Sequence, residues 1–175
     1  MEDLLLVRPT LELERAALDY QREHLACGEN ELHGSALMDQ LPYDEWVQRT
    51  LENAHPDTVH GDWVEADTFI VERQTDHRII GMVDIRHSLD TPFLAQVAGH
   101  IGYGVRPSER RKGYATAILG LALEHARRLG LSRVMLACYG DNEGSRRTIL
   151  KWGGGKEREF VHTDGKTVEV YWITL

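Results

Sequence analysis

The sequence has little of what marks several large classes of protein. Only two of its 175 residues are cysteines, Cys27 and Cys138, and their wide separation excludes a disulfide framework and a cysteine-based metal site. No apolar run approaches the roughly 20 residues that a membrane helix needs, and the start, Met1-Glu2-Asp3, lacks the basic region of a signal peptide. We therefore expect a cytoplasmic protein that spans no membrane, and no metal is predicted.

Positive charge is also scarce, with 20 Lys and Arg against 28 Asp and Glu and a net charge of -8. This excess of acid argues against nucleic acid as the main partner, because such binding depends on neutralising phosphates. The charge is unevenly spread: residues 29–72 hold eleven acidic residues and one basic residue, whereas residues 106–151 hold ten basic and four acidic ones. The second segment suits a polyanionic ligand. The first either attracts a cationic amine or is a solvated face that keeps the protein soluble.

One stretch combines glycine with basic residues in a pattern typical of phosphate binding. Residues 102–116 run from a strand-like segment through the basic turn Arg110-Arg111-Lys112-Gly113 into a helix that begins at Tyr114. Glycine lets the backbone approach a ligand closely, and the first amides of a helix lack acceptors within the helix. Together with the positive end of the helix dipole, these amides attract an anion. The turn is therefore predicted to bind a diphosphate.

The strand predicted over residues 96–105 contains three glycines, Gly99, Gly102 and Gly104. Glycine weakens an ordinary strand, so its presence indicates a bulge or the close approach of a ligand. In a regular strand, His100 lies on the same face as Gly102 and Gly104. The sequence thus predicts a strand face without side chains at Gly102 and Gly104, with one titratable group, His100, at its end.

Hydrophobic periodicity and turn residues predict the other elements. Residues 29–42 are expected to form a long loop, and such loops are often functional. Gly120 lies inside a predicted helix, where glycine costs about 1 kcal/mol relative to Ala, so it indicates a close neighbour. The predicted strands are 4–8, 68–72, 79–87, 96–105, 133–139, 156–161 and 167–174, and the predicted helices are 10–28, 43–53, 114–129 and 142–152.

The spacing Arg110-x-x-Gly113-x-Ala115 resembles the Arg/Gln-x-x-Gly-x-Gly/Ala motif of the GCN5-related N-acetyltransferases, the GNAT family, whose loop holds the pyrophosphate of coenzyme A. A second matching element, Asn142-x-x-Ser145, follows the next predicted strand. The resemblance spans roughly residues 96–152. It implies an α/β (α+β) fold in a single domain over residues 1–175, with a central mixed, mostly antiparallel β-sheet flanked by helices. The sheet is expected to have a V-shaped split between two parallel strands, residues 96–105 and 133–139.

The resemblance further implies an enzyme that moves an acetyl group from acetyl-CoA to a primary amine by direct attack in a ternary complex. In the family, the segment between the first two helices borders the acceptor, so His33 and Tyr43 are the predicted substrate-binding residues, for a small-molecule or peptide amine. The predicted cofactor-binding residues come from the glycine-rich strand, the turn and the helix after the next strand: Tyr103, Gly104, Val105, Arg110, Arg111, Lys112, Gly113, Tyr114, Ala115, Thr116, Asn142, Ser145 and Arg147.

Two catalytic residues are predicted by position. His100 stands where the family often has a Glu that deprotonates the amine, and its reference pKa of about 6.5 suits proton transfer near neutrality; a structural hydrogen bond is the alternative. The family's second motif often carries a Tyr that protonates the thiolate, but Ile149 occupies that position. Tyr139, at the end of a predicted strand, is the replacement considered, with water as the other proton source and packing as the other role for Tyr139.

The missing Tyr leaves open a second interpretation, a non-catalytic acyl-CoA-binding sensor or regulatory module. A P-loop nucleotide site is excluded because the turn lacks Gly-x-x-x-x-Gly-Lys-Ser/Thr. Neither the identity of the amine nor the oligomeric state, a homodimer included, follows from the sequence.

Overall fold

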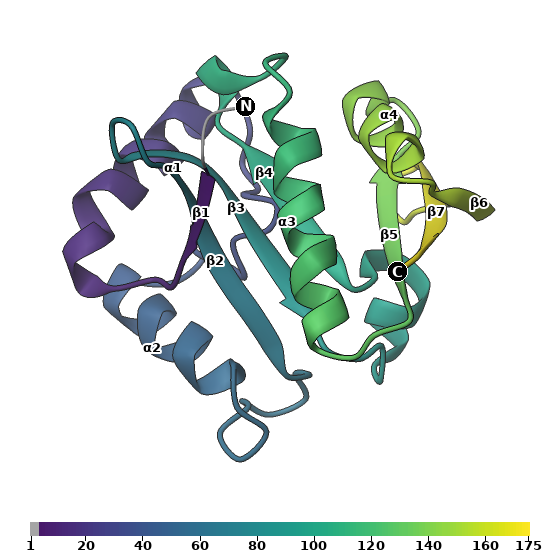
Figure 1. Cartoon of the computed structure of the whole chain (residues 1–175), viewed down its shortest axis with the longest axis horizontal. Helices are drawn as coiled ribbons and strands as arrows, with labels where there is room; N and C mark the ends of the chain where they lie inside the picture. Colours follow the sequence, from purple (N-terminus) through teal and green to yellow (C-terminus); the bar gives the residue numbers. More distant parts are fainter. Residues whose placement is uncertain (1–3) are drawn as a thin grey trace.

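The computed structural model describes residues 4–175; the start Met1-Glu2-Asp3 lies outside the described residues. The strands form two neighbouring sheets (Figure 1), one of four strands in the order β1-β2-β3-β4 and one of three strands in the order β5-β7-β6. Within each sheet, neighbouring strands are antiparallel. The strands are β1 (Leu4–Val7), β2 (Ala66–Arg73), β3 (Arg78–Arg86), β4 (Ile101–Val105), β5 (Arg133–Tyr139), β6 (Gly155–Val161) and β7 (Thr167–Thr174).

Helices cover both faces of the four-stranded sheet. Helix α3 packs on one face together with the apolar side chains of β5 and β7, and α1 and α2 pack on the other. This explains why residues 69–71 of β2 and 79–83 of β3 are continuous apolar runs: both faces of these strands are buried there. Figure 1 shows α4 next to β5, beyond α3. The helices are α1 (Glu14–Ala26), α2 (Tyr43–Asn53), α3 (Tyr114–Arg128) and α4 (Glu143–Lys151), with short helical turns η1 (Leu11–Leu13), η2 (Leu94–Ala98) and η3 (Pro107–Glu109).

Strands β4 and β5 meet at one point, just before the start of β4 and midway along β5. Gly99 forms an isolated bridge with Leu136, and the His100 N–H donates to the Met135 carbonyl oxygen at 2.8 Å. From there, among residues 4–175, β4 pairs with β3 alone and β5 with β7 alone. The two strands therefore leave their junction side by side and diverge. This is the V-shaped split that the resemblance implies, and the predicted fold class is confirmed.

The strand predicted over residues 96–105 is too long. Residues 94–98 form the π-helical turn η2, and β4 begins only at Ile101. Gly99 ends the turn with a positive φ of 73° and donates its N–H to the carbonyl oxygen of Leu94 at 2.8 Å. A left-handed glycine reverses the course of the chain, which period-two alternation cannot reveal.

The glycine face of β4 is covered by the protein itself. The loop after α1 crosses it, so that a Cβ on Gly104 would lie 2.6 Å from the carbonyl oxygen of His33, and a Cβ on Gly34 would lie 2.6 Å from the Cα of Tyr103. Gly102 and Gly104 therefore allow the close approach of another chain segment on this face, where the sequence suggested a ligand. No helix within residues 4–175 is both long and apolar enough to cross a membrane.

Candidate active site

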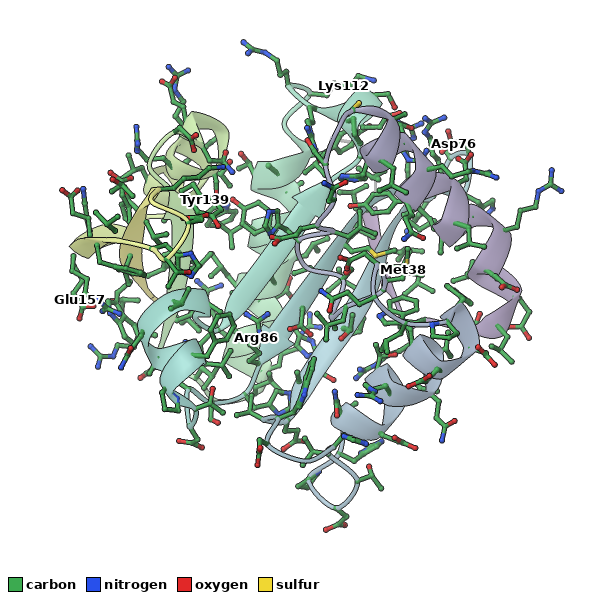
Figure 2. The ribbon with its side chains drawn as sticks, turned by 180° about the vertical axis from the view of Figure 1, so that it is seen from behind. Met38, Asp76, Arg86, Lys112, Tyr139 and Glu157 are labelled. Atoms are coloured by element: carbon green, nitrogen blue, oxygen red, sulfur yellow. The ribbon has the colours of Figure 1, made fainter. Side chains whose placement is uncertain are left out.

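A cleft of about 990 Å³ opens where β4 and β5 diverge. Its walls come from the end of β4, the turn before α3, the start of α4, the loop after α1 and the β6–β7 turn. Figure 2 shows Tyr139 on the β5 side and Lys112 at the outer rim of the turn. Twelve of the thirteen predicted cofactor residues line the cleft, Lys112 being the exception, and they are joined there by His33, Tyr139 and a group that the sequence did not single out: Glu29, Asn30, Glu31, Glu109, Glu143, Gly144, Thr148, Asp164 and Lys166.

The turn before α3 has the backbone geometry of an anion site. Gly113 is the N-cap of α3 with a φ of 88°, and Arg111 also has a positive φ, 63°. The N–H groups of Tyr114, Ala115 and Thr116 open the helix and have no acceptor within it. All three residues line the cleft, so the positive end of the α3 dipole faces the cleft. The donor set fits the diphosphate of a coenzyme A molecule.

A buried carboxylate at the edge of the cleft, Glu109, fixes the turn. Glu109 accepts hydrogen bonds from Lys112 Nζ at 2.9 Å and Arg73 Nη1 at 3.2 Å, and it forms an ion pair with Arg78. Burial opposes ionisation of Glu109, but these cations outweigh it and lower its pKa below the ordinary value. Lys112 therefore braces the turn through Glu109 and does not line the cleft.

Arg110, the first residue of the motif, is bound to the protein itself. Its guanidinium donates to both carboxylate oxygens of Glu29, at 2.6 and 2.8 Å, and its Nε donates to the Val105 carbonyl oxygen at 3.1 Å. The Arg110 hydrogen bonds hold the pKa of Glu29 at about 2 despite partial burial. This bidentate pair ties the loop after α1 to the turn. Arg110 thereby positions two walls of the cleft.

The opposite wall is α4, which is anchored at both ends. Asn142 is its N-cap, with Oδ1 accepting the N–H of Ser145 at 3.1 Å, and the Tyr103 hydroxyl and Ser145 Oγ are 3.0 Å apart across the cleft. At the other end, Trp152 donates Nε1–H to the Thr116 carbonyl oxygen at 2.9 Å and packs where a Cβ on Gly120 would come within 2.5 Å of it. The close neighbour predicted at Gly120 is confirmed.

Comparison with known proteins decides the family. The model of the Acetyltransferase (GNAT) family matches residues 34–153, more than half of the chain. The chain belongs to this family. An uncharacterized N-acetyltransferase of Bacillus subtilis (strain 168), YoaA, is 30% identical to this GNAT protein over 99 residues, which is 54% of each chain, so the match spans about half the length of that relative.

Solved acetyltransferase structures share the fold of this GNAT protein. The ribosomal-protein-S5-alanine acetyltransferase from Vibrio fischeri is 20% identical, with a TM-score of 0.72 over 98% of this chain and 91% of that one. The microcin C7 self-immunity acetyltransferase MccE, solved in complex with acetyl-CoA and AMP, is 16% identical, with a TM-score of 0.71 over 100% and 94% of the two chains. The family predicted from the motif is confirmed.

Tyr139 lines the cleft of this GNAT protein from the end of β5. Its hydroxyl donates to Asp164 Oδ2 at 3.1 Å, and Lys166 Nζ lies 5.1 Å from the ring centroid. Burial, then the hydrogen bond to Asp164, raises the pKa of Tyr139 above its usual value of about 10. The phenol is therefore protonated at neutral pH and available as a proton donor.

Besides Lys112, two predicted site residues, Tyr43 and His100, lie outside the residues that line the cleft. Tyr43 is buried in the α1–α2 layer, where its hydroxyl donates to the Thr10 carbonyl oxygen at 2.8 Å. His100 is only 6% exposed, and its Nδ1 accepts the N–H of Met135 at 2.9 Å. Burial, then the charges of Arg86 and Arg133, lowers the pKa of His100 to about 4. The resemblance to the family suggested both assignments, and both side chains are buried in the structure.

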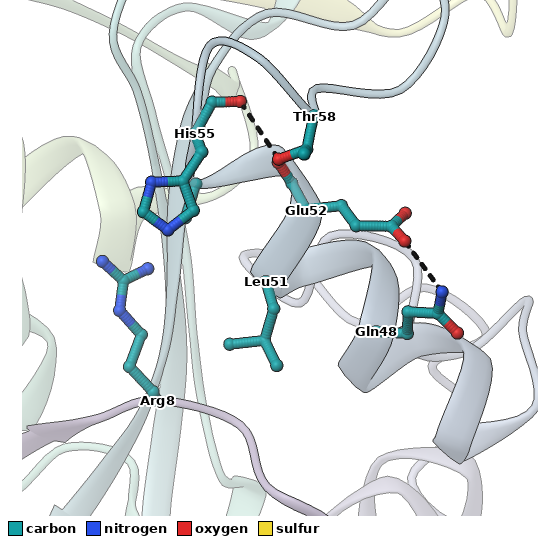
Figure 3. A pocket seen from close by; sticks show the side chains of 7 residues that line it. Arg8, Gln48, Leu51, Glu52, His55 and Thr58 are labelled. Carbon is teal, nitrogen blue, oxygen red and sulfur yellow. Dashed lines mark hydrogen bonds between the residues drawn. The ribbon is translucent and has the colours of Figure 1, made fainter.

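A second hollow, of about 360 Å³, lies beside the C-terminal end of α2 (Figure 3) and contains no predicted site residue. Arg8 points into it from beyond β1, and its guanidinium is bound to the buried Asp67. On the α2 side, Gln48 donates to Glu52 at 2.8 Å. In the part of the chain that the structure describes, no three His, Cys, Asp or Glu side chains are grouped to hold a metal ion.

Proposed function

We propose that this GNAT protein transfers the acetyl group of acetyl-CoA to a primary amine by direct attack in a ternary complex. The observation that carries the proposal is a single cleft that combines the Gly113 turn, the first amides of α3 and the parted edges of β4 and β5. The acetyl-CoA in the MccE structure supports the same ligand class for a protein of the same fold.

Different residues of the cleft bind different parts of acetyl-CoA. The amides of residues 114–116 and the Arg111 side chain bind the diphosphate, and Asn142 and Arg147 border it from α4. Beyond the β4–β5 junction, no strand among residues 4–175 pairs with residues 103–105 on the cleft side. The Val105 carbonyl oxygen accepts from Arg110 Nε, so the other main-chain groups of this segment would bind an extended pantetheine. A β4 amide that polarises the thioester oxygen, together with positioning of the two reactants, supplies the rate.

The far side of the cleft suits an amine. Glu31 and Asp164 line it beside Tyr139, and both carboxylates raise the pKa of that phenol. Local negative charge attracts an ammonium group to this side. His33 also lines the cleft, and we propose it as an acceptor-binding residue. Small-molecule and peptide amines both satisfy this chemistry.

The chemical step needs two proton transfers. The neutral amine nitrogen attacks the thioester carbon, the C–S bond breaks, and the new amide nitrogen gives up one proton to a base or to water. We propose that the departing thiolate takes its proton from the Tyr139 hydroxyl. A thiol has a reference pKa of about 8.5, below that of the phenol, so Tyr139 stabilises the departing thiolate as a hydrogen-bond donor, and the proton that it transfers is replaced by the one that the amine nitrogen has released.

Tyr139→Phe is expected to lower kcat about 100-fold, the scale of general acid catalysis, with acetyl-CoA affinity unchanged. Tyr103→Phe is the matched variant, because Tyr103 is the other phenol of β4 and β5 that lines the cleft and its hydroxyl is bound to Ser145. Steady-state kinetics with both substrates varied measures the effect. Equal kcat in the wild type and Tyr139→Phe would remove Tyr139 as the acid, and a loss confined to Tyr103→Phe would transfer the role to Tyr103.

Calorimetric titration with acetyl-CoA and, separately, with ATP tests the function, followed by release of free thiol from acetyl-CoA across a panel of amines. Micromolar one-to-one binding of acetyl-CoA, little response to ATP and amine-dependent thiol release are expected. Tight binding without release for any amine would favour the sensor interpretation. Absence of acetyl-CoA binding would overturn the assignment of the cleft.

A further inference from the structure

His100 lies where the two sheets part, and it makes two hydrogen bonds to one residue of β5. Its main-chain N–H donates to the carbonyl oxygen of Met135 at 2.8 Å, and its ring Nδ1 accepts the N–H of Met135 at 2.9 Å. In a continuous ladder, the N–H of a strand residue donates to a main-chain carbonyl of the neighbouring strand. Here an imidazole nitrogen takes the place of that carbonyl.

The main chain around His100 is held on its other side by β3. The N–H of Arg86 donates to the His100 carbonyl oxygen at 2.7 Å, and the Arg86 guanidinium donates to the Gly99 carbonyl oxygen at 3.1 Å. Gly99 is pressed against β5, since a Cβ there would lie 2.4 Å from the Met135 carbonyl oxygen. The backbone at this point is therefore fixed to β3 and, through the His100 N–H, to β5, and the imidazole adds a second hydrogen bond to β5.

We propose that His100 is a positioning residue that joins β5 to β4 and sets the opening of the cleft, in place of the proton acceptor that its sequence position suggested. The proposal rests on the proposed function, because it concerns the cleft that would bind acetyl-CoA. Past this joint, the strands separate toward Tyr103 and Tyr139, which line opposite walls. Hydrogen bonds at the point where β4 and β5 separate control the distance between the two strands.

The hydrogen bond requires Nδ1 to be unprotonated, and the surroundings favour the neutral ring. Arg86 faces it from β3, Arg133 lies on β5, and the Trp172 ring of β7 is 6.0 Å away. The nearest carboxylate on β3, Asp84, is paired with Arg86 at 3.0 Å. Two cations and a buried position disfavour an imidazolium here.

Three variants separate positioning from catalysis. Asn places Oδ1 at the branch position of Nδ1, so His100→Asn keeps an acceptor for Met135 but has no titratable base. His100→Gln carries its oxygen one bond further out, and His100→Ala has no acceptor. Calorimetry with acetyl-CoA and kcat with one amine are measured for each variant beside the wild type.

For His100→Asn, acetyl-CoA affinity and kcat are expected within about threefold of the wild type, because the acceptor is kept. For His100→Ala, acetyl-CoA affinity is expected to fall at least about tenfold, the scale of a buried donor left without an acceptor, and His100→Gln is expected to lie between the two. If His100→Asn binds acetyl-CoA normally but loses about 100-fold in kcat, the scale of a missing base, the proposal is overturned.

The affinity measurements distinguish failure of the positioning role of His100 from failure of the proposed acetyl transfer. A wild type that binds acetyl-CoA but acetylates no amine leaves the role of His100 testable by affinity alone, and unchanged acetyl-CoA affinity in His100→Ala would then overturn the proposal.

Unfolding by urea provides a second readout. A buried His with a lowered pKa stabilises the fold above the unfolded pKa of about 6.5, and that contribution is lost as pH falls toward about 4. Between pH 7.5 and 4.5, the urea concentration at the midpoint of unfolding should therefore fall more for the wild type than for His100→Asn. Equal falls would contradict a neutral His100 ring that accepts the Met135 N–H.

Discussion

Gly113→Glu abolishes acetyl-CoA binding while the protein stays folded; this is the expected result of placing a carboxylate in the turn before α3. No atom lies within 4 Å of a Cβ built on Gly113, so the side chain has room. The φ of 88° adds strain of roughly 1–2 kcal/mol for a residue other than glycine. A negative charge beside a diphosphate adds several kcal/mol more. The strain lowers stability in the free and the bound protein alike, so the charge repulsion is the term that acts on binding, and it predicts a loss of affinity of about 1000-fold or greater.

Two variants at the same position separate strain, bulk and charge. Gly113→Ala introduces the strain alone and is expected to weaken acetyl-CoA binding about tenfold at most, whereas Gly113→Gln matches the size of Glu without its charge. Calorimetry measures affinity, and circular dichroism checks that each variant is folded. Wild-type affinity in Gly113→Glu would show that the diphosphate binds elsewhere, and equal losses in the Gln and Glu variants would assign the effect to bulk.

Gly34→Ala is expected to destabilise the protein by roughly 3–5 kcal/mol, a large effect for one methyl group. Its Cβ would lie 2.6 Å from the Cα of Tyr103 and 2.7 Å from the carbonyl oxygens of Gly102 and Met82. All three atoms are main chain, so no side chain can rotate away. The φ of 77° adds the strain of a left-handed residue. The loop after α1 must lift from β4, which also displaces His33 from the cleft.

Gly28→Ala is the matched control, since Gly28 has a similar φ of 81° but no atom within 4 Å of its Cβ. It is expected to cost about 1 kcal/mol. Urea unfolding gives both values, and the difference between the two variants isolates the contact with β4. Similar losses for Gly28→Ala and Gly34→Ala would mean that the loop yields easily and is not held tightly on the strand.

Local signals in the sequence predicted the elements well. Helix α2 and strands β5 and β7 have the bounds that periodicity indicated, and the turn at Gly113 has the left-handed conformation that glycine permits. These features depend on neighbouring residues, which a sequence displays directly. The cofactor side of the cleft could be predicted for the same reason, because one contiguous turn and helix start provide it.

The remaining features depend on contacts between distant segments. Glu29 binds Arg110 across 81 positions of sequence, and nothing near either residue indicates the pair. Tyr43 begins an amphipathic helix, and its spacing is the same whether it faces a core or a cleft. The spacing of His100 predicts a side chain on the glycine face of a regular strand, but its ring accepts the N–H of Met135 on β5, a contact that spacing does not reveal.

The split between β4 and β5 also bears on aggregation. A sheet that parts in its middle has two inner edges as well as two outer ones, and exposed strand edges invite pairing with other chains. The outer edge at β6 carries Lys156-Glu157-Arg158-Glu159, charges that discourage such pairing. The inner edges face each other inside a cleft walled by α3, α4 and the loop after α1. These walls limit the access of a strand from another chain to the inner edges, which disfavours strand exchange between copies of the protein.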